Sequence, residues 1–487
     1  MSTLKSILIL VISSIQITMY AQNHFNSIYT GNGYDYGEGV FQSKKDSSYY
    51  VTGSSSSFEN APSQAFVMHL DTGGTYLWSK AYGGQASDIG KRIFHIPNDG
   101  IYVAGFSSSF SNGLFDFYFF KTDTDGVLIW EKTFGGSSNE ILHDALMLPD
   151  TSFILVGQTT SNPTEIEDIF ITRISKKGEI IWTKTIGSSG VDIAKSISMI
   201  DLNHIIIGGE YYDTDSTKQK GLLLSINQTG DIQWLKTYGN KKSNYYITDV
   251  YADSSFIRAV GYAQMNITSD KVYYNMTSDS LGFNYNENYI PQSGSNYYSQ
   301  IVQYGSSKYH YLSMQPTNNS IIPTYSGGED LQICRYKNDL TWYPKCVNPS
   351  NHGDDHCNQL ISTSDGGALS VGFNVYGGKG GSNVSLLKIG PYDQFPSGSI
   401  DPTEHTIVEI EELKNTLTLS IFPNPVSTEL TIETNIKEAI KVEILSLNGI
   451  VLQEKWISDK TQINIENFEK GIYFIRIGVF IKKITFI

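Results

Sequence analysis

The sequence predicts an all-β protein: a seven-bladed β-propeller followed by a small Ig-like β-sandwich. Three observations support this prediction. A tryptophan recurs at positions 78, 130, 182 and 234, each 52 residues after the last. Short β-rich runs that end in glycine keep the same interval, and no segment shows a sustained helical period. A fixed interval of this length is typical of a repeat architecture, and the four-stranded blade is a unit of that size.

Each repeat contains four short strands. One unit reads "AKSISMI", "HIIIGGEY", "GLLLSIN" and "DIQWLKTYG", separated by Gly, Asn and Asp clusters. A glycine stands four residues before each tryptophan, where a turn with positive φ is expected. The tryptophan itself is expected to pack between blades. The glycine that ends the second strand, or its counterpart, marks seven units at positions 53, 105, 157, 209, 261, 313 and 372.

The first and last repeats complement each other. The seventh unit stops after "NVSLLKIG" without a tryptophan strand, whereas "HFNSIYTGNG" near the start matches "LWSKAYGGQA" with Phe25 in the tryptophan position. A ring of sheets closes by sharing a blade in this way, which removes the exposed edges. We therefore expect residues 22–391 to form the propeller. An open solenoid is the alternative, and it leaves the incomplete unit unexplained.

The termini and the charge limit where the chain works and what it binds. Residues 1–21 have a basic start, an apolar run too short to span a bilayer and a small-residue end, which is typical of a signal peptide. No other stretch is apolar enough for a membrane helix. The formal net charge of −14 disfavours binding to nucleic acid.

The three cysteines lie close together in an exported chain, which favours one disulfide. If "ICRYKNDLTWYPKC" is a hairpin, Cys334 and Cys346 face each other, and this is the preferred pair. The alternative is a zinc site in "CVNPSNHGDDHC", whose spacing is irregular. Its candidate ligands are Cys346, His352, Asp354, Asp355, His356 and Cys357.

Calcium is the other cofactor alternative. "DTDG" at Asp123 and "DTDST" at Asp213 are similar to calcium loops, but they lack the full ligand string and are expected to be turns. No cofactor is predicted.

The phrases "LDTGGTYLW" and "TDTDGVLIW" resemble the tryptophan-docking motif of quinoprotein-like propellers, which include quinone-cofactor dehydrogenases and outer-membrane assembly lipoproteins. The resemblance covers the blades and implies only their architecture. The cofactor and calcium residues of the dehydrogenases have no counterpart that can be identified here, so no redox activity is carried over.

The repeat ends before a proline-containing acidic stretch, residues 392–416, which is expected to be a linker. Residues 417–487 contain about seven short alternating strands. "IFPNPVSTELTIE", "KVEILSLNGIVL" and "NFEKGIYFIRI" resemble the three blocks of the C-terminal sorting domain of the type IX (Por) secretion system of the Bacteroidetes.

The resemblance implies export through the outer membrane, then release or attachment at the cell surface, with the secretion machinery as partner. An ordinary adhesion-type sandwich is the alternative. The motif residues carried over by position are Pro423, Asn424 and Pro425 in the opening turn, Gly449 in the middle turn, and Gly471 with Tyr473 in the last hairpin.

No catalytic residue is predicted, because none of the common hydrolase, metalloprotease or nucleotide-binding motifs occurs in its required setting. Five acids follow the glycine pairs at equivalent positions. Together they would ring one mouth of the channel and bind a cation or a basic group. The alternative is that each accepts N–H bonds within its own loop. The five are Asp35, Asp88, Glu140, Asp192 and Asp355.

The region where the repeat decays is rich in tyrosine: 13 of the 82 residues from Tyr262 to Tyr343. Tyrosine combines a flat apolar ring with a polar tip, which suits recognition of sugars or proteins. The alternative is that these rings replace lost tryptophans in the packing. The candidate ligand-binding tyrosines are Tyr273, Tyr274, Tyr285, Tyr289, Tyr297 and Tyr298.

Together these features predict a secreted or surface-displayed binding or adhesion protein, expected to be a monomer, whose ligand is a polysaccharide or a protein. One rival function is a polysaccharide lyase or hydrolase that uses the channel mouth. The other is a structural component of a surface layer.

Overall fold

The computed structural model divides into two compact units, residues 1–407 and residues 408–487. The signal peptide expected at residues 1–21 lies outside the described part of the chain. The structure describes residues 24–58, 62–111, 114–264, 271–290, 296–303, 309–316, 331–337, 345–349, 354–375, 381–391, 398–400, 402–406, 420–433, 440–446, 451–457, 460–465, 468–477 and 480–486.

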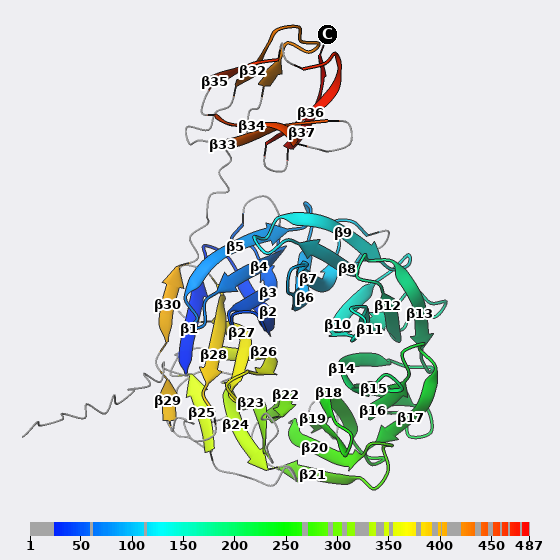
Figure 1. Ribbon diagram of the computed structural model, residues 1–487. Coiled ribbons are helices and arrows are strands. Elements are labelled where there is room, and N and C mark those ends of the chain that lie inside the picture. The colour runs from blue at the N-terminus through cyan, green and yellow to red at the C-terminus, as the bar shows by residue number, and fades with distance from the viewer. Residues whose placement is uncertain are drawn as a thin grey trace, which may run out of the picture. The chain divides into compact units, whose positions relative to one another are not determined.

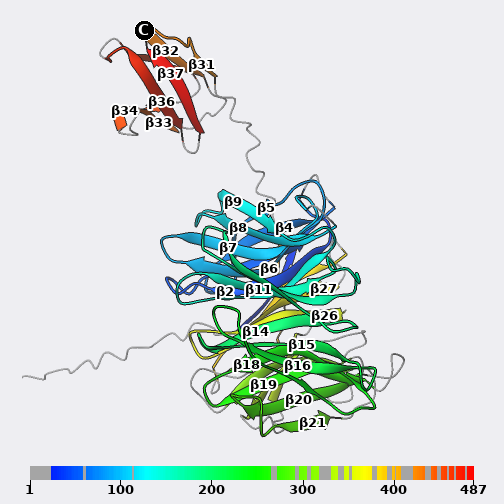
Figure 2. The same ribbon diagram turned by 90° about the vertical axis from the view of Figure 1, so that its right-hand side faces the viewer.

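The first unit is a ring of seven antiparallel sheets, the blades, with the first strand of each blade nearest the axis (Figure 1). Figure 2 shows the same blades from the side. Blade 1 is β2 Asp35–Gln42, β3 Tyr49–Ser55, β4 Gln64–Leu70 and β5 Tyr76–Tyr82. Blade 2 is β6 Asp88–Ile96, β7 Gly100–Ser107, β8 Asp116–Thr122 and β9 Leu128–Phe134. Blade 3 is β10 Glu140–Met147, β11 Phe153–Thr159, β12 Asp168–Ile174 and β13 Ile180–Ile186.

The next two blades keep the same order of four consecutive strands. Blade 4 is β14 Ile193–Asp201, β15 His204–Asp213, β16 Lys218–Ile226 and β17 Ile232–Tyr238. Blade 5 is β18 Asn244–Ala252, β19 Phe256–Gln264, β20 Val272–Asp279 and β21 Asn286–Ile290. The decayed repeat therefore still forms a complete sheet.

The last two blades complete the ring, and each has a fifth strand. Blade 7 takes its fourth strand from the N-terminus, because β1 Phe25–Thr30 pairs antiparallel with β28 Asn383–Ile389, which confirms the predicted closure. Blade 6 is β22 Asn296–Gln303, β23 Tyr309–Pro316, β24 Gln332–Lys337, β25 Lys345–Pro349 and β29 Gly398–Ile400. Blade 7 is β26 Asp354–Ser362, β27 Ala368–Val375, β28 Asn383–Ile389, β1 Phe25–Thr30 and β30 Thr403–Thr406.

The repeated tryptophan contacts the repeated turn glycine of the next blade. Gly126 has φ +76°, and a Cβ there would lie 2.8 Å from the Trp78 ring. Phe25 takes the tryptophan role at the closure, since a Cβ on Gly74 would lie 2.7 Å from its ring. Glycine is required here by both the left-handed backbone and the close approach of the aromatic ring. The repeated phrase is thus the inter-blade packing motif.

Each blade is buried on both faces. Between blades 3 and 4, for example, Val156 and Ile171 pack with Ile207 and Leu222, all fully buried. Strands buried on both faces need apolar residues at consecutive positions, which is why the sequence shows runs such as "HIIIGG" and "GLLLSI".

In the described residues no helix has the length and apolarity needed to span a membrane.

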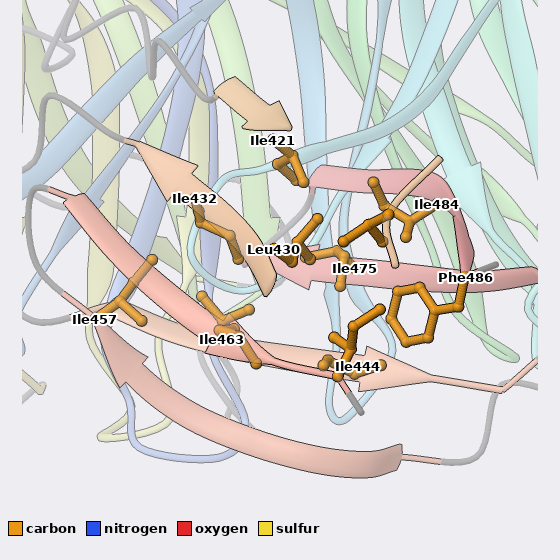
Figure 3. Close-up of a cluster of buried hydrophobic side chains, with 12 residues drawn as sticks. Ile421, Leu430, Ile432, Ile444, Ile457, Ile463, Ile475, Ile484 and Phe486 are labelled. Carbon is orange, nitrogen blue, oxygen red and sulfur yellow. The ribbon is translucent and has the colours of Figure 1, made fainter. Parts of the chain in front are cut away.

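The second unit is a sandwich of two sheets. Buried side chains from both sheets, among them Leu430, Ile444 and Ile475, point toward one another in one apolar core (Figure 3). One sheet is β31 Ser420–Phe422, β32 Glu429–Glu433 and β35 Lys460–Asn464. The other sheet, in spatial order, is β34 Val451–Ile457, β33 Ile440–Leu445, β36 Gly471–Ile477 and β37 Phe480–Phe486.

Candidate functional site

The five acids expected around a channel mouth lie at or next to the start of inner strands, and each is bonded within its own blade. One Asp88 oxygen accepts hydrogen bonds from the Gly84 N–H at 2.9 Å and from the Ser109 hydroxyl at 2.7 Å. The Ser107 hydroxyl donates to its other oxygen. The structure buries all five, with exposed fractions of 0% for Asp35, Asp88, Glu140 and Asp192 and 2% for Asp355.

The surroundings of these acids are those of structural carboxylates. Burial raises the pKa of Asp35, and hydrogen bonds from Ser55 and Ser57 oppose that rise. Burial likewise raises the pKa of Asp192, which accepts the Tyr212 N–H at 2.7 Å. Asp355 accepts a hydrogen bond from the Asn374 amide at 2.6 Å. The repeated acid therefore joins the first two strands of a blade rather than facing an open mouth.

The cysteine and histidine cluster separates in the structure. Cys334 and Cys346 face each other in register on β24 and β25, and their sulfurs form a disulfide. Cys357 is buried in β26, and His356 stacks on Phe373 at 4.3 Å. His352 lies outside the described residues. The part of the chain that the structure describes contains no group of three or more potential metal ligands.

The two sequences similar to calcium loops are turns. The Asp123 carboxylate accepts the N–H groups of Asp125 at 2.9 Å and Val127 at 2.8 Å. Asp213 accepts the Asp215 N–H at 3.1 Å and the Ser216 hydroxyl at 2.5 Å. Each carboxylate thus serves as the acceptor that fixes its own turn.

The tyrosine-rich region divides into buried and exposed rings. Tyr273 and Tyr274 are fully buried in the cores between blades, so they serve packing. Tyr285, just before the outer strand β21 of blade 5, and Tyr289, on that strand, are exposed. Tyr297 and Tyr298 lie on β22, and their side chains are outside the described residues. The packing interpretation therefore applies to Tyr273 and Tyr274, whereas Tyr285 and Tyr289 are exposed and can contact a ligand.

The exposed rings belong to one surface, which we name the blade 5 aromatic surface: Leu281, Phe283, Tyr285 and Tyr289. They occupy the β20–β21 turn and β21, with exposed fractions of 50%, 59%, 51% and 42% in that order. Tyr285 stands 52 residues beyond Gln233 and 104 beyond Ile181, at the same place in the repeat. At the same place blades 1 to 4 carry Leu77, Ile129, Ile181 and Gln233, none of which is aromatic.

The turn below this surface is fixed by hydrogen bonds. The Asp279 carboxylate accepts the N–H groups of Leu281 at 3.1 Å and Phe283 at 2.7 Å. Blade 4 holds the same turn from the other side, because the Tyr238 hydroxyl donates to the Gly282 carbonyl at 2.8 Å. The Lys236 ammonium donates to the Leu281 carbonyl at 2.6 Å and lies 2.9 Å from the centre of the Phe283 ring.

The two exposed tyrosines are held by neighbouring rings and by one carboxylate. Tyr285 packs edge-on against Tyr238 at 5.2 Å. The Glu287 carboxylate accepts hydrogen bonds from Tyr289 at 3.0 Å and from buried Tyr274 at 2.9 Å. Burial raises the pKa of Tyr289, with help from Tyr245 and Glu287, so its phenol stays protonated. The surface thus presents preorganised aromatic faces next to a carboxylate.

Sequence reasoning missed a set of bonds that tie the inner strands together. Arg92 of blade 2 pairs with Asp144 of blade 3 at 2.6 Å, and Asp144 accepts the Ile197 N–H of blade 4 at 2.9 Å. Asp249 of blade 5 accepts the Ser196 hydroxyl of blade 4 and the Ile301 N–H of blade 6 at 2.8 Å. The side chains of this set, Arg92, Asp144, Ser196 and Asp249, stand four places after the repeated acid or the residue that replaces it. Their types differ from blade to blade, so only their shared position in the repeat could have revealed them.

In the C-terminal unit, the described motif residues lie in the turn after β31 and in β36. Pro423 to Pro425 form the exposed turn between β31 and β32, and the Asn424 side chain accepts the Thr485 N–H at 2.9 Å. Tyr473 of β36 stacks on Phe486 at 4.3 Å, beside the shared core. Gly449 lies outside the described residues.

Solved structures similar to this chain include three of different function. One is the Pan2 WD40 domain of Neurospora crassa, at 12% identity and TM-score 0.42, over 74% of this chain and 91% of that one. The second is PorZ, a surface component of the type IX secretion system of Porphyromonas gingivalis, at 12% identity and TM-score 0.39. The match covers 96% of this chain and 59% of PorZ. The third is the phage phi92 endosialidase, at 9% identity and TM-score 0.43, over 90% and 75%. With all three TM-scores below 0.5, the fold is assigned from the strand order itself.

No curated protein has a sequence similar to that of this chain. Residues 420–485, however, match the family described as the secretion system C-terminal sorting domain. These residues coincide with the two-sheet sandwich, and they imply an interaction with the type IX secretion machinery. The protein is therefore a type IX secretion substrate with a β-propeller body, secreted or attached to the cell surface.

Proposed function

We propose that the propeller is an extracellular binding module that holds a polysaccharide on the blade 5 aromatic surface. The observation that supports this proposal is the exposure of Phe283 and Tyr285 in the β20–β21 turn and of Tyr289 on β21. Sugar rings stack on aromatic faces through their C–H groups, and adjacent carboxylates and amides accept and donate hydrogen bonds with the hydroxyls. Glu287 and the exposed Asn286 and Asn288 are the polar groups interleaved with the rings.

The geometry favours recognition over scaffolding. An exposed apolar ring costs solvation and contributes nothing to the core, so a cluster of such rings marks a contact site. The turn that carries them is fixed to blade 4 by Lys236 and Tyr238, which lowers the entropy lost when a ligand binds.

The test is a pull-down of the full-length exported protein on insoluble cellulose, chitin, starch and xylan, with released sugar measured in the same tubes. We expect retention on at least one polysaccharide without release. Tyr285→Ala with Tyr289→Ala should weaken retention about tenfold or more, since each stacked ring contributes roughly 1 kcal/mol.

A matched control is available in blade 3, where Ile181 and Thr185 take the same places in the repeat. Ile181→Ala with Thr185→Ala should leave retention unchanged. Retention that both double variants keep would contradict the proposed surface, and released sugar would make the protein an enzyme. If no polysaccharide retains the protein, its ligand is of another class.

A further inference from the structure

The sandwich has a surface cleft of about 570 Å³. It is bordered by the edge strand β34, the end of β35, the segment before β36 and β36 itself. Four of the six described residues that line it belong to the second and third sequence blocks of the sorting domain, so two of the three blocks meet here. The six residues are Leu452, Gln453, Asn464, Phe468, Glu469 and Tyr473.

The aromatic lining of the cleft is held in place by the core. Tyr473 stacks on Phe486 with ring centres 4.3 Å apart. Phe468 packs edge-on against both rings, 5.6 Å from Tyr473 and 5.4 Å from Phe486. The Tyr473 hydroxyl donates to the Glu469 carbonyl at 2.7 Å, and Phe486 belongs to the buried core (Figure 3). Because these rings are fixed before a partner binds, binding loses less entropy.

Strand β34 adds an exposed apolar side chain to the cleft. Leu452 is 47% exposed, and the residue that β34 contributes to the core is Ile457. The polar side chains of Gln453 and Glu469 lie beside it in the lining. An exposed apolar surface with polar groups around it is typical of a contact site for another protein. The cleft can therefore accept an apolar side chain from a partner.

Gly471, a motif residue at the start of β36, is not required by the fold of the sandwich. Its φ lies outside the left-handed region. Among the described residues, a Cβ at this position would meet only the Tyr473 ring, at 3.8 Å, which is an ordinary van der Waals distance. Gly126 of the propeller differs in both respects, with φ +76° and a Cβ distance of 2.8 Å.

A larger side chain at position 471 would suit the strand better than glycine does, because β-branched residues favour strands. Glycine inside a strand often marks a place where a ligand or another backbone approaches closely. At Gly471 the missing side chain leaves the space beside the Tyr473 ring open. This motif glycine is thus explained by a partner and not by packing.

We propose that the type IX secretion machinery holds the sandwich at this cleft. One of its proteins inserts an apolar side chain between Leu452 and the Tyr473 ring, and its backbone passes over Gly471. The match to the sorting-domain family implies that this unit interacts with the machinery, and the blocks of that family line the cleft. The site lies in the sandwich, so it goes beyond the polysaccharide surface of blade 5 and does not depend on it.

The experiment measures export of the full-length protein from its native cells, by immunoblots of the periplasm, the cell surface and the medium. Gly471→Ile fills the space beside Tyr473 with a residue that favours strands, and Leu452→Asp places a charge in the apolar lining. Each should lower the exported fraction by about tenfold or more, as expected for a central apolar contact, and the protein should accumulate in the periplasm. Gly471→Ala, which adds one methyl group, should lower export far less.

Trp456→Asp is the matched control, because Trp456 is 67% exposed on the same strand and does not line the cleft. It should be exported like the wild type. Thermal unfolding of each purified variant checks that the sandwich is folded. All of these variants should keep the polysaccharide retention of the wild type, so this test and the pull-down can fail separately.

A photoreactive benzoylphenylalanine in place of Gln453 tests the contact directly and does not depend on the stability of the Gly471 variants. Illumination of exporting cells should join it to a protein of the secretion machinery, identified by mass spectrometry, whereas the same group in place of Trp456 should not be joined. Normal export of folded Gly471→Ile and Leu452→Asp, or an equal loss of export in Trp456→Asp, would overturn the proposal. An adduct formed only with a second copy of this chain would overturn the assignment of the partner.

Discussion

At the scale of single residues, the carboxylates Asp144 and Asp249 connect blades through the inner strands. Each receives a donor from the preceding blade and a backbone N–H from the following one. Asp144 has a cationic partner in Arg92, whereas both donors from the neighbouring blades to Asp249 are neutral. Burial raises the pKa of Asp249 to about 7, and the Asp144 charge adds to that rise.

This raised pKa predicts a pH-dependent contribution to stability. The unfolded state loses the proton near pH 4 and the folded state near pH 7, so in that window the folded state binds more protons. The free energy of unfolding from this group therefore falls by about 1.4 kcal/mol per pH unit as the pH rises from 4 to 7.

Asp249→Asn tests this prediction, because an asparagine can accept the Ile301 N–H and donate to Ser196 but does not titrate. In urea unfolding at pH 4.5, 5.5 and 6.5, the wild-type advantage over the variant should shrink at each step. Other titrating groups cancel in the difference between the two proteins. A difference that stays constant over this range would contradict the assignment.

At the scale of elements, the sequence predicted the structural features whose residue type is the same in each blade. The packing between blades was predicted from Trp78 and Gly126, and the closing strand from Phe25. These positions could be recognised because the same contact between an aromatic ring and a glycine recurs at each junction between blades.

The β-bulge of each inner strand was not predicted, since its extra residue differs in type between blades, as Glu38, Lys91 and Thr248 do. The repeated acids are bonded by groups after or within the adjacent strand, such as Ser107 for Asp88, Thr159 for Glu140 and Asn374 for Asp355, which spacing alone does not reveal.

Two short strands of the expected linker, β29 and β30, also escaped prediction. Strands of three and four residues carry no readable alternation. β30 pairs in parallel with β1, from Ser27↔Thr403 to Thr30↔Thr406, and His405 stacks on Tyr29 at 5.1 Å. It therefore covers the outer edge of the strand that closes the ring.

Replacing Thr403–Thr406 by Gly-Ser-Gly-Ser should expose that edge. The β1 amides that face β30 lose their acceptors, so their hydrogen exchange should accelerate about tenfold, as expected for one lost hydrogen bond. Mass spectrometry of a peptide covering Phe25–Thr30 measures this rate. Peptides from β15 should exchange as before, and unchanged exchange in β1 would show that β28 alone protects the strand.

At the scale of the whole molecule, two units carry separate tasks. The propeller holds the blade 5 aromatic surface, and the sandwich at residues 420–485 is the address for secretion. The sandwich has its own core, in which Leu430, Ile444 and Ile475 are at most 1% exposed. The tasks should therefore be separable by mutations that unfold one unit and leave the other intact.

Leu430→Asp is the mutation that we expect to unfold the sandwich and leave the propeller intact. It places a carboxylate at a fully buried position in a core shared by two small sheets, at a cost of several kcal/mol, which is comparable to the stability of a small domain. We expect the sandwich to unfold and the protein to remain in the periplasm, as cell fractionation and immunoblotting would show. Leu452→Asp, at a position 47% exposed on β34, should leave the sandwich folded.

The propeller itself should be unaffected by Leu430→Asp, because none of its described inter-blade contacts involves the sandwich core. Protein recovered from the periplasm should keep the polysaccharide retention of the wild type. Loss of export with retained binding would show that the sandwich acts as an address alone. Normal export of an unfolded Leu430→Asp sandwich would mean that the machinery reads a linear motif such as Pro423–Pro425 instead of the folded unit.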